Sequence, residues 1–365
     1  MEYIWIFAAI FAAACQTARS AFQKNMIPLL GDYGAAYIRF CYALPFTSLI
    51  WLIWINISGN SIPDLSFYSI FLCFLGSIFQ ILFTYVLMKV FSHKSFAAGI
   101  AFSKTEVILI AFLEVIILNV IFSLPLIIGI TLGVLSVLFL SYAKKAENII
   151  DTIKLLISSV SSMGTLIGLL SGLLLAGSVV TFRMSIISID GPLLDRSLFV
   201  SFIAIVFQTI FVGVYLFFVK KNEFFAVIKY WKPSLPAGLC GTGATFGWFV
   251  AFGLTTAAEV RAVGQIELIF SILISLLFFK ERLKKTELFG IILGVLSVLF
   301  LSYAKKAENI IDTIKLLISS VSSMGTLIGL LSGLLLAGSV VTFRMSIISI
   351  DGPLLDRSLL SLIHI

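Results

Sequence analysis

Apolar runs of about 20 residues recur from one end of this 365-residue sequence to the other, with short connections between them. About 20 residues of helix cross the roughly 30 Å hydrocarbon core of a bilayer. Hydrophobic residues make up 60% of the chain and charged residues only 12%, about half the charged share of a soluble domain. The sequence therefore predicts an all-α polytopic membrane protein.

The hydropathy pattern predicts ten transmembrane helices. Their expected ranges are 3–23, 33–54, 67–88, 95–118, 124–142, 164–184, 197–219, 235–255, 258–279 and 286–303. Pro28 falls in the first connection, where proline is expected to end a helix, and Pro45 is expected to kink the second span. Between the fifth and sixth spans, residues 146–160 predict a short amphipathic helix at the membrane interface.

A long duplication occupies the end of the chain. Residues 132–198 recur without a single change at 293–359, an offset of 161 residues. Loops diverge fastest between evolved repeats, yet the loop AKKAENIIDTIK is copied unchanged. The last six residues, LSLIHI, read as a translated sequencing adapter. We therefore expect residues 304–365, a copy of 143–198 with an adapter-like tail, not to be native. Finding the duplication in genomic DNA would contradict this.

An older, divergent repeat underlies the rest of the sequence. Arg19 aligns with Arg183, and Glu106 aligns with Glu267. Because each unit would hold five helices, an odd number, the two units would insert in opposite orientations, which is the inverted-repeat plan of secondary transporters. The predicted domains are a first five-helix repeat at 1–142, a loop with an interfacial helix at 143–163, and a second five-helix repeat at 164–303.

Lysine and arginine are divided unevenly between two sets of connections. The connections after the odd-numbered spans hold nearly all of them, including the run KERLKK at 280–285. The positive-inside rule then predicts that these connections are cytoplasmic and that both termini lie outside. This pattern explains the net charge of +7 without a nucleic-acid partner. The expected location is the bacterial inner membrane.

Charged side chains within the predicted spans are the candidates for chemistry, because each costs about 2.5–3.5 kcal/mol at the bilayer centre. They are Arg19, Arg39, Lys104, Glu106, Glu114, Glu259, Arg261 and Glu267. Structural ion pairs are the alternative role, above all for Arg19 and Glu114, which lie toward the ends of their spans. Glu106 and Glu267 are mid-span and recur in the repeat, which favours a functional role.

The ninth span offers a way to bind a carboxylate. On a continuous helix Arg261 and Gln265 share one face, where their N–H groups can donate charge-assisted hydrogen bonds. The predicted substrate-binding residues are Arg39, Gln80, Lys104, Glu106, Trp248, Arg261, Gln265 and Glu267. Gln80 and Trp248 have packing within the core as an alternative role. Glu106 or Glu267 is also a candidate to exchange a proton with the substrate.

The sequence gives little support for a metal site or for an enzyme active site. The four cysteines lie in apolar runs without paired spacing, and the chain has two histidines, so no metal or cofactor is expected. No His-Glu-x-x-His or Gly-x-Ser-x-Gly motif occurs. The expected partners are a small-molecule metabolite, membrane lipid and a proton as candidate coupling ion.

Several short motifs resemble one transporter family. The run EVRAVGQIE at 259–267, the first-span QTAR at 16–19 and the fourth-span KTE at 104–106 are similar to EamA-type permeases of the drug/metabolite transporter superfamily. The likeness covers about residues 1–303, although the Glu-Arg pair usual after the fourth helix is missing from LNVIFSL. The resemblance implies an exporter of amino acids or other small metabolites with a central cavity. The alternative is a lipid-linked carrier or head-group flippase on the same fold.

Overall fold

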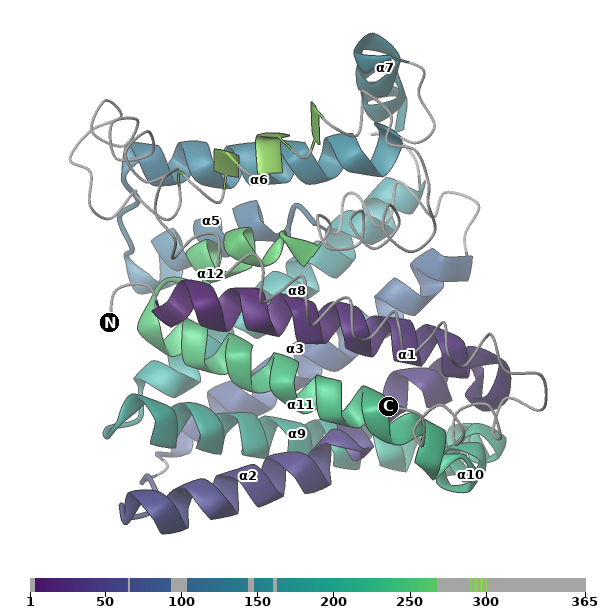
Figure 1. Cartoon of the computed structure of the whole chain (residues 1–365), viewed down its shortest axis with the longest axis vertical. Helices are drawn as coiled ribbons and strands as arrows, with labels where there is room; N and C mark the ends of the chain where they lie inside the picture. Colours follow the sequence, from purple (N-terminus) through teal and green to yellow (C-terminus); the bar gives the residue numbers. More distant parts are fainter. Residues whose placement is uncertain are drawn as a thin grey trace, which may run out of the picture.

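The computed structural model describes residues 4–64, 66–92, 104–143, 148–159 and 163–267, and several positions between 289 and 300 (Figure 1). All regular elements in these ranges are α-helices. They are α1 (Ile4–Cys41), α2 (Ala43–Ser58), α3 (Phe67–Ser92), α5 (Glu106–Leu118), α6 (Leu124–Ala143), α7 (Ile149–Ser159), α8 (Met163–Ile187), α9 (Leu193–Val219), α10 (Lys221–Lys229), α11 (Trp231–Leu254) and α12 (Ala257–Gly264).

Six helical segments in the described residues are long and apolar enough to cross a membrane. They are Ile4–Gln23, Asn25–Ser58, Phe67–Val86, Met163–Ile187, Leu193–Val219 and Trp231–Leu254. The predicted class, an all-helical membrane protein, is confirmed. Most of the predicted ninth span, parts of the fourth and tenth, and the whole duplicated tail at 304–365 lie outside the described residues.

The long helices lie side by side and alternate in direction, so their connections gather at two ends of the bundle (Figure 1). At one end, which we call the α8–α9 end, Asp195 of α9 accepts hydrogen bonds from Trp54 and Asn60, at and beyond the end of α2. At the other, the α10 end, Tyr42 donates a hydrogen bond to the carbonyl of Val227. The charged connections around α10 therefore lie on one side of the bundle.

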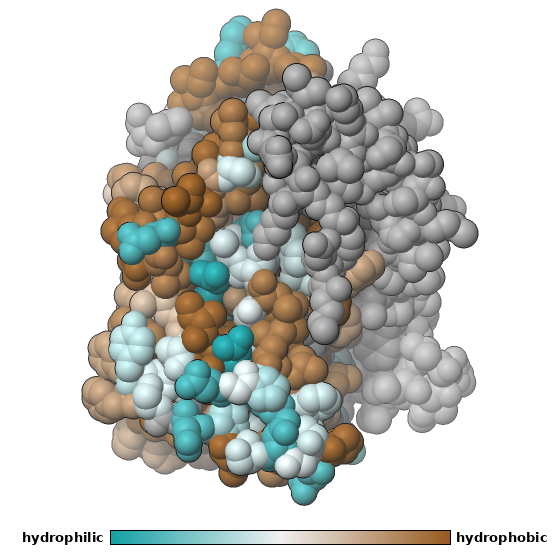
Figure 2. All heavy atoms as spheres, turned by 90° about the vertical axis from the view of Figure 1, so that its left-hand side faces the viewer, coloured by the Kyte–Doolittle hydropathy of each residue, from teal (hydrophilic) through white to brown (hydrophobic). Residues whose placement is uncertain are grey.

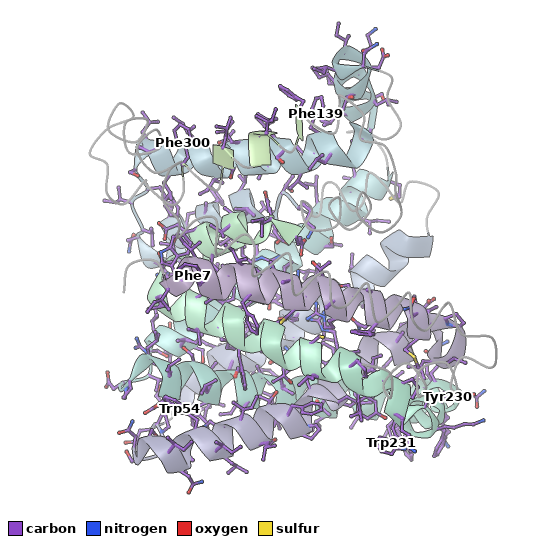
Figure 3. All side chains as sticks on the ribbon, viewed as in Figure 1. Phe7, Trp54, Phe139, Tyr230, Trp231 and Phe300 are labelled. Atoms are coloured by element: carbon purple, nitrogen blue, oxygen red, sulfur yellow. The ribbon has the colours of Figure 1, made fainter. Side chains whose placement is uncertain are left out.

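The outer surface suits a bilayer. Large apolar side chains such as Leu49, Ile210 and Leu239 are more than half exposed on the sides of the helices. Figure 2 looks onto the α8–α9 end, where hydrophilic residues gather over the lower part of the face. Trp54 lies at this end and Tyr230 and Trp231 lie at the α10 end (Figure 3). Amphipathic rings at both ends are typical of the two membrane interfaces.

The first connection is helical, contrary to the prediction. Helix α1 continues to Cys41 with Pro28 inside it, so the expectation that Pro28 ends a helix is wrong. The chain breaks at Gly31, whose φ of 73° suits glycine. A break of this kind frees backbone N–H groups, and the carboxylate of Glu223 in α10 accepts the N–H of Gly34 at 2.8 Å.

The predicted second span is interrupted near Pro45, although the interruption lies three residues before the proline. The helix is interrupted at Tyr42, and α2 restarts at Ala43 with Pro45 in its first turn. Proline is tolerated in a first turn because its missing N–H would have no partner there. The predicted interfacial helix is also present, as α7, with Ile150, Ile153 and Ile157 exposed along one side.

Helix α1 packs closely along α11 through small residues. Gly243 lies against Cys15 and Gly247 against Ala12, the close approach that two glycines four residues apart allow. Helix α3 packs in the same way against α8, where Gly76 lies against Thr181 and Phe182. The repeat alignment equates α1 with α8 and α11 with α3. These two helix pairs would therefore be counterparts.

Replacing Gly238 with alanine is expected to destabilise the α1–α11 contact. A Cβ at Gly238 would lie 2.4 Å from the backbone carbonyl of Tyr42, which a rigid main chain cannot relieve by rotation. Overpacking of this kind costs about 1–3 kcal/mol. A lower midpoint of thermal unfolding in detergent would show it, whereas Leu239→Ala on the exposed side of α11 should have a smaller effect. Equal midpoints for the two variants would contradict the close contact.

Candidate functional site: a central polar cavity

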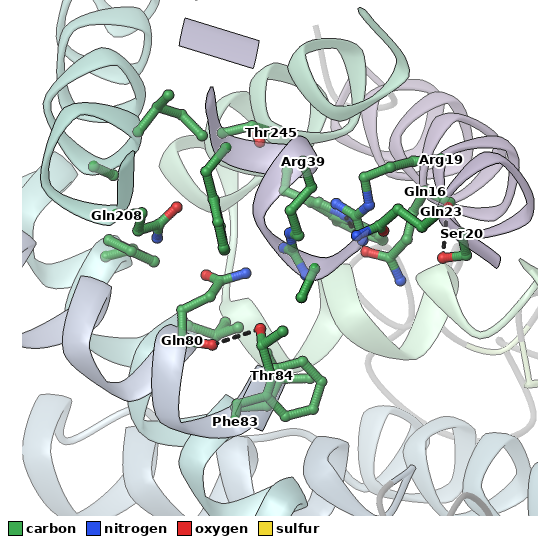
Figure 4. A pocket seen from close by; sticks show the side chains of 18 of the residues that line it. Gln16, Arg19, Ser20, Gln23, Arg39, Gln80, Phe83, Thr84, Gln208 and Thr245 are labelled. Atoms are coloured by element: carbon green, nitrogen blue, oxygen red, sulfur yellow. Dashed lines mark hydrogen bonds between the residues drawn. The ribbon is translucent and has the colours of Figure 1, made fainter. Parts of the chain in front are cut away.

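A cavity of about 790 Å³ lies between α1, α3, α8, α9, α11 and α12. Its wall is aromatic toward the α8–α9 end, where Phe182, Phe249 and Phe252 line it. Polar side chains surround the rest (Figure 4). Those with an amide or guanidinium group are Gln16, Arg19, Gln23, Arg39, Gln80, Gln208 and Arg261.

An ion pair in the cavity wall connects the start of α5 with the segment after α12. The Lys104 ammonium pairs with the Glu267 carboxylate. The other oxygen of Glu267 accepts a hydrogen bond at 2.8 Å from the amide of Gln16, whose carbonyl accepts the indole N–H of Trp248 at 3.1 Å. The resulting chain of four polar side chains fixes the wall where α1, α11 and the segment after α12 meet.

A second ion pair lies beside the first and is more deeply buried. The Nε of Arg261 donates to the Glu106 carboxylate at 3.0 Å, and its Nη2 also contacts that carboxylate. The Arg261 guanidinium stacks 4.7 Å from the centre of the Trp248 ring. Both charged side chains are more than nine-tenths buried. Each charge therefore has the partner that burial in a low-dielectric site requires.

A short turn directly precedes each of the two cavity glutamates. Helix α12 begins with a capping box formed by Thr256 and Glu259, and it ends at Gly264. A turn at residues 265–266 precedes Glu267, just as a turn at residues 104–105 precedes Glu106. The two turns are 161 residues apart, the spacing at which Glu106 and Glu267 align.

A third buried ion pair lies outside the cavity, at the α8–α9 end. Glu114 of α5 pairs with Arg183 of α8 at 2.9 Å. Its two oxygens also accept the backbone N–H groups of Ala257 and Ala258, at 2.8 and 3.0 Å. The carboxylate therefore caps the N-terminus of α12, where the helix dipole favours a negative charge. This geometry gives Glu114 a structural role.

Comparison with known proteins decides the kind of molecule that carries this cavity. Residues 162–303 match the model of the EamA-like transporter family. This part of the chain is an EamA-like transporter domain. The matched range ends where the tenth span is predicted to end. The family consists of membrane transporters, and six helical segments of the described residues are long and apolar enough to cross a membrane.

Solved structures support the fold of this protein, although no curated protein matches its sequence. One match, titled only as the crystal structure of a protein, has a TM-score of 0.58 at 10% identity. The alignment covers 84% of this chain and 99% of the other. At this identity the likeness concerns the fold alone.

The cavity gathers most of the residues that the sequence predicts for the site. The lining includes Arg39, Gln80, Lys104, Glu106, Trp248, Arg261 and Glu267. Gln265 is not among the lining residues, because its amide turns toward the backbone and donates to the Lys104 carbonyl at 3.2 Å. The predicted pairing of Arg261 with Gln265 on one face assumed a continuous helix, and the break after Gly264 removes that premise.

The sequence alone gives no site role to several residues that line the cavity. Gln16 connects Trp248 to Glu267, and Gln208 is a buried amide on α9. Arg19 was weighed as a structural ion-pair residue but lies on the cavity wall. The available signal was a lone amide inside an apolar run, which is costly in a bilayer unless it meets a partner or a cavity.

Proposed function

We propose that this protein is a secondary transporter that exports a small polar or zwitterionic metabolite, such as an amino acid. The observation that carries the proposal is the cavity, which is large enough for a small solute and is lined by charged and amide side chains. Ligand sites combine an apolar wall with a few placed polar groups in this manner. The aromatic part of the wall, formed by Phe182, Phe249 and Phe252, would contact the apolar part of the solute.

The direction of opening supports alternating access. The lining residues with exposed side chains are Ser20 and Asp32, among those the structure describes. Both lie on the stretch of α1 that leads to the α10 end, where Lys220, Lys221, Lys229 and Lys232 also lie. If these lysines mark the cytoplasmic side, the described conformation faces the cytoplasm, which is the side from which an exporter loads.

The correspondence between the halves supports an inverted-repeat mechanism. The α1–α11 and α3–α8 contacts would be counterparts, and each half has a turn just before its cavity glutamate. In such transporters one unit rocks against the other around a site near the midplane. The two ion pairs cross between the units, so we propose that they hold the units together during this motion.

The test is metabolite export from cells that express the full chain. We expect one class of polar solute to accumulate outside, and we expect the Lys104→Gln/Glu267→Gln double variant to lose this accumulation without leaving an unpaired charge. Lys232→Gln, at an exposed position, is the matched control. If the double variant and the control export equally, the cavity is not the pathway. If lipid head groups change sides instead, the flippase alternative replaces the proposal.

Proton coupling has its own test. Both candidate proton carriers, Glu106 and Glu267, line the cavity, and each is paired with a cation. A proton-coupled exporter should slow when a protonophore collapses the pH gradient at constant membrane potential. Export that continues unchanged would rule out the proton as the coupling ion.

A further inference from the structure

Two arginines of the cavity have no carboxylate partner among the described residues. Arg19 is 6% exposed, and its Nε forms no hydrogen bond in the described part of the chain. Arg39 lines the same cavity, with its guanidinium 4.8 Å from the centre of the Phe40 ring. Arginine remains charged in proteins, so both side chains place a positive charge in the cavity.

The carboxylates that line the cavity do not neutralise these two arginines. Glu106 is occupied by Arg261 and Glu267 by Lys104. The third carboxylate of the lining, Asp32, is exposed at the mouth. Arg261 lines the same cavity, so three guanidinium groups share its wall. A buried charge beside like charges is costly unless an anion joins it, and the described protein supplies none.

The repeat shows where a protein carboxylate would have been placed. Arg183, the counterpart of Arg19, is neutralised by Glu114. At the spacing of 161 residues that aligns Glu106 with Glu267, the counterpart of Glu114 is position 275, which is a serine. Both halves therefore hold an arginine at this position. Arg183 has a carboxylate partner, and Arg19 lacks the equivalent carboxylate.

The two arginines approach each other at the surface of α11. A Cβ at Gly241 would lie 3.1 Å from the backbone carbonyl of Arg39 and 3.5 Å from Cδ of Arg19. Figure 4 shows both side chains projecting into the same part of the cavity, between Gln16 and Gln80. One small solute could therefore contact both guanidinium groups and the neighbouring amides.

We infer that Arg19 and Arg39 bind the anionic groups of the substrate, and that this substrate is a small metabolite with two negative charges. The inference rests on the proposed function and specifies its substrate class. A dicarboxylate and a phosphate group share the required chemistry, because guanidinium groups donate paired hydrogen bonds to either. Bound substrate supplies the counter-charge that the described protein lacks.

The test is equilibrium dialysis of the purified full chain in low-salt detergent solution. Radiolabelled succinate and radiolabelled inorganic phosphate are the two dianions, and alanine is the zwitterion for comparison. We expect one dianion to bind at least about tenfold more tightly than alanine, since each charge-assisted hydrogen bond contributes about that factor. Arg19→Gln and Arg39→Gln should each weaken dianion binding about tenfold or more, and Arg19→Lys should weaken it less.

The control separates this site from arginine in general. Arg196→Gln changes an arginine of α9 that does not line the cavity and should leave dianion binding unchanged. The empty Arg19→Gln protein should unfold at a higher temperature than the wild type, because it loses an uncompensated buried charge. Full dianion binding by Arg19→Gln, or alanine binding as tightly as both dianions, would overturn the inference.

The outcome is distinguishable from failure of the proposed function. If neither dianion binds while the export assay shows a neutral or zwitterionic solute outside, the dianion inference fails and the transporter proposal stands. If no solute is exported and none binds, both fail. If phosphate binds and succinate does not, the substrate class narrows to phosphorylated solutes.

Discussion

Replacing Glu114 with alanine is expected to destabilise the protein by about 3–5 kcal/mol, the usual effect of removing one partner of a buried ion pair. The change leaves Arg183 without its carboxylate and uncaps two backbone N–H groups of α12. Reversible unfolding in mixed micelles would measure it. Asp190→Ala, at an exposed acidic residue of the same end, should change the stability little.

A second variant tests whether the pair or the cap dominates. The Glu114→Gln/Arg183→Gln double variant removes both charges together, so it should be more stable than Glu114→Ala. If Glu114→Ala is no more harmful than Asp190→Ala, the α8–α9 end is not held together by this carboxylate.

Replacing Arg261 with glutamine is expected to cost a similar 3–5 kcal/mol, because it leaves the Glu106 carboxylate buried without a partner. It also removes the cation that stacks on Trp248. The Glu106→Gln/Arg261→Gln double variant should recover much of the stability, since it contains neither charge. Unfolding in mixed micelles measures the stability, and solute exchange in proteoliposomes measures the activity.

The double variant distinguishes a structural from a functional ion pair. If the pair takes part in transport, the double variant should be stable and inactive. A double variant that is stable and transports as well as the wild type would show that the Glu106–Arg261 pair only holds the helices together.

The sequence predicts the long spans well where the apolar run alone determines the helix. The ranges expected for the third, sixth and seventh spans fall within α3, α8 and α9 or within a residue of them. The sequence does not predict a helix at α10, because its charged residues lower the hydropathy of the segment. The helix has only a short apolar side, formed by Phe224 and Val227. That side is buried only when α10 meets α1.

The site was harder to predict because its ion pairs join residues that are far apart in the sequence. Hydropathy finds Lys104, Glu106, Arg261 and Glu267 as charges within spans, but it does not say which cation meets which anion. The partners depend on the turns at residues 104–105 and 265–266, and no proline or consecutive glycines mark either turn in the sequence. A helical wheel for an unbroken ninth helix therefore places Gln265 beside Arg261 in the site, whereas its amide contacts the Lys104 carbonyl.

Likewise, the sequence separates Glu114 from Glu106 only by position along a helix. Both are buried glutamates of α5 that face an arginine. Glu106, at the first residue of α5, meets the cavity, whereas Glu114 lies two turns further along and meets the start of α12. The difference between binding and structural roles thus arises from packing that no single-sequence pattern contains.

The central claim, that solute passes through the cavity, is tested most directly by blocking it. Thr245 lines the cavity and Thr131 lies on the exposed side of α6, and each donates its hydroxyl to a backbone carbonyl four residues earlier. Thr245→Trp and Thr131→Trp therefore make a matched pair for solute exchange in proteoliposomes. The account predicts that Thr245→Trp abolishes exchange while Thr131→Trp retains it. Undiminished exchange by a folded Thr245→Trp protein would contradict it.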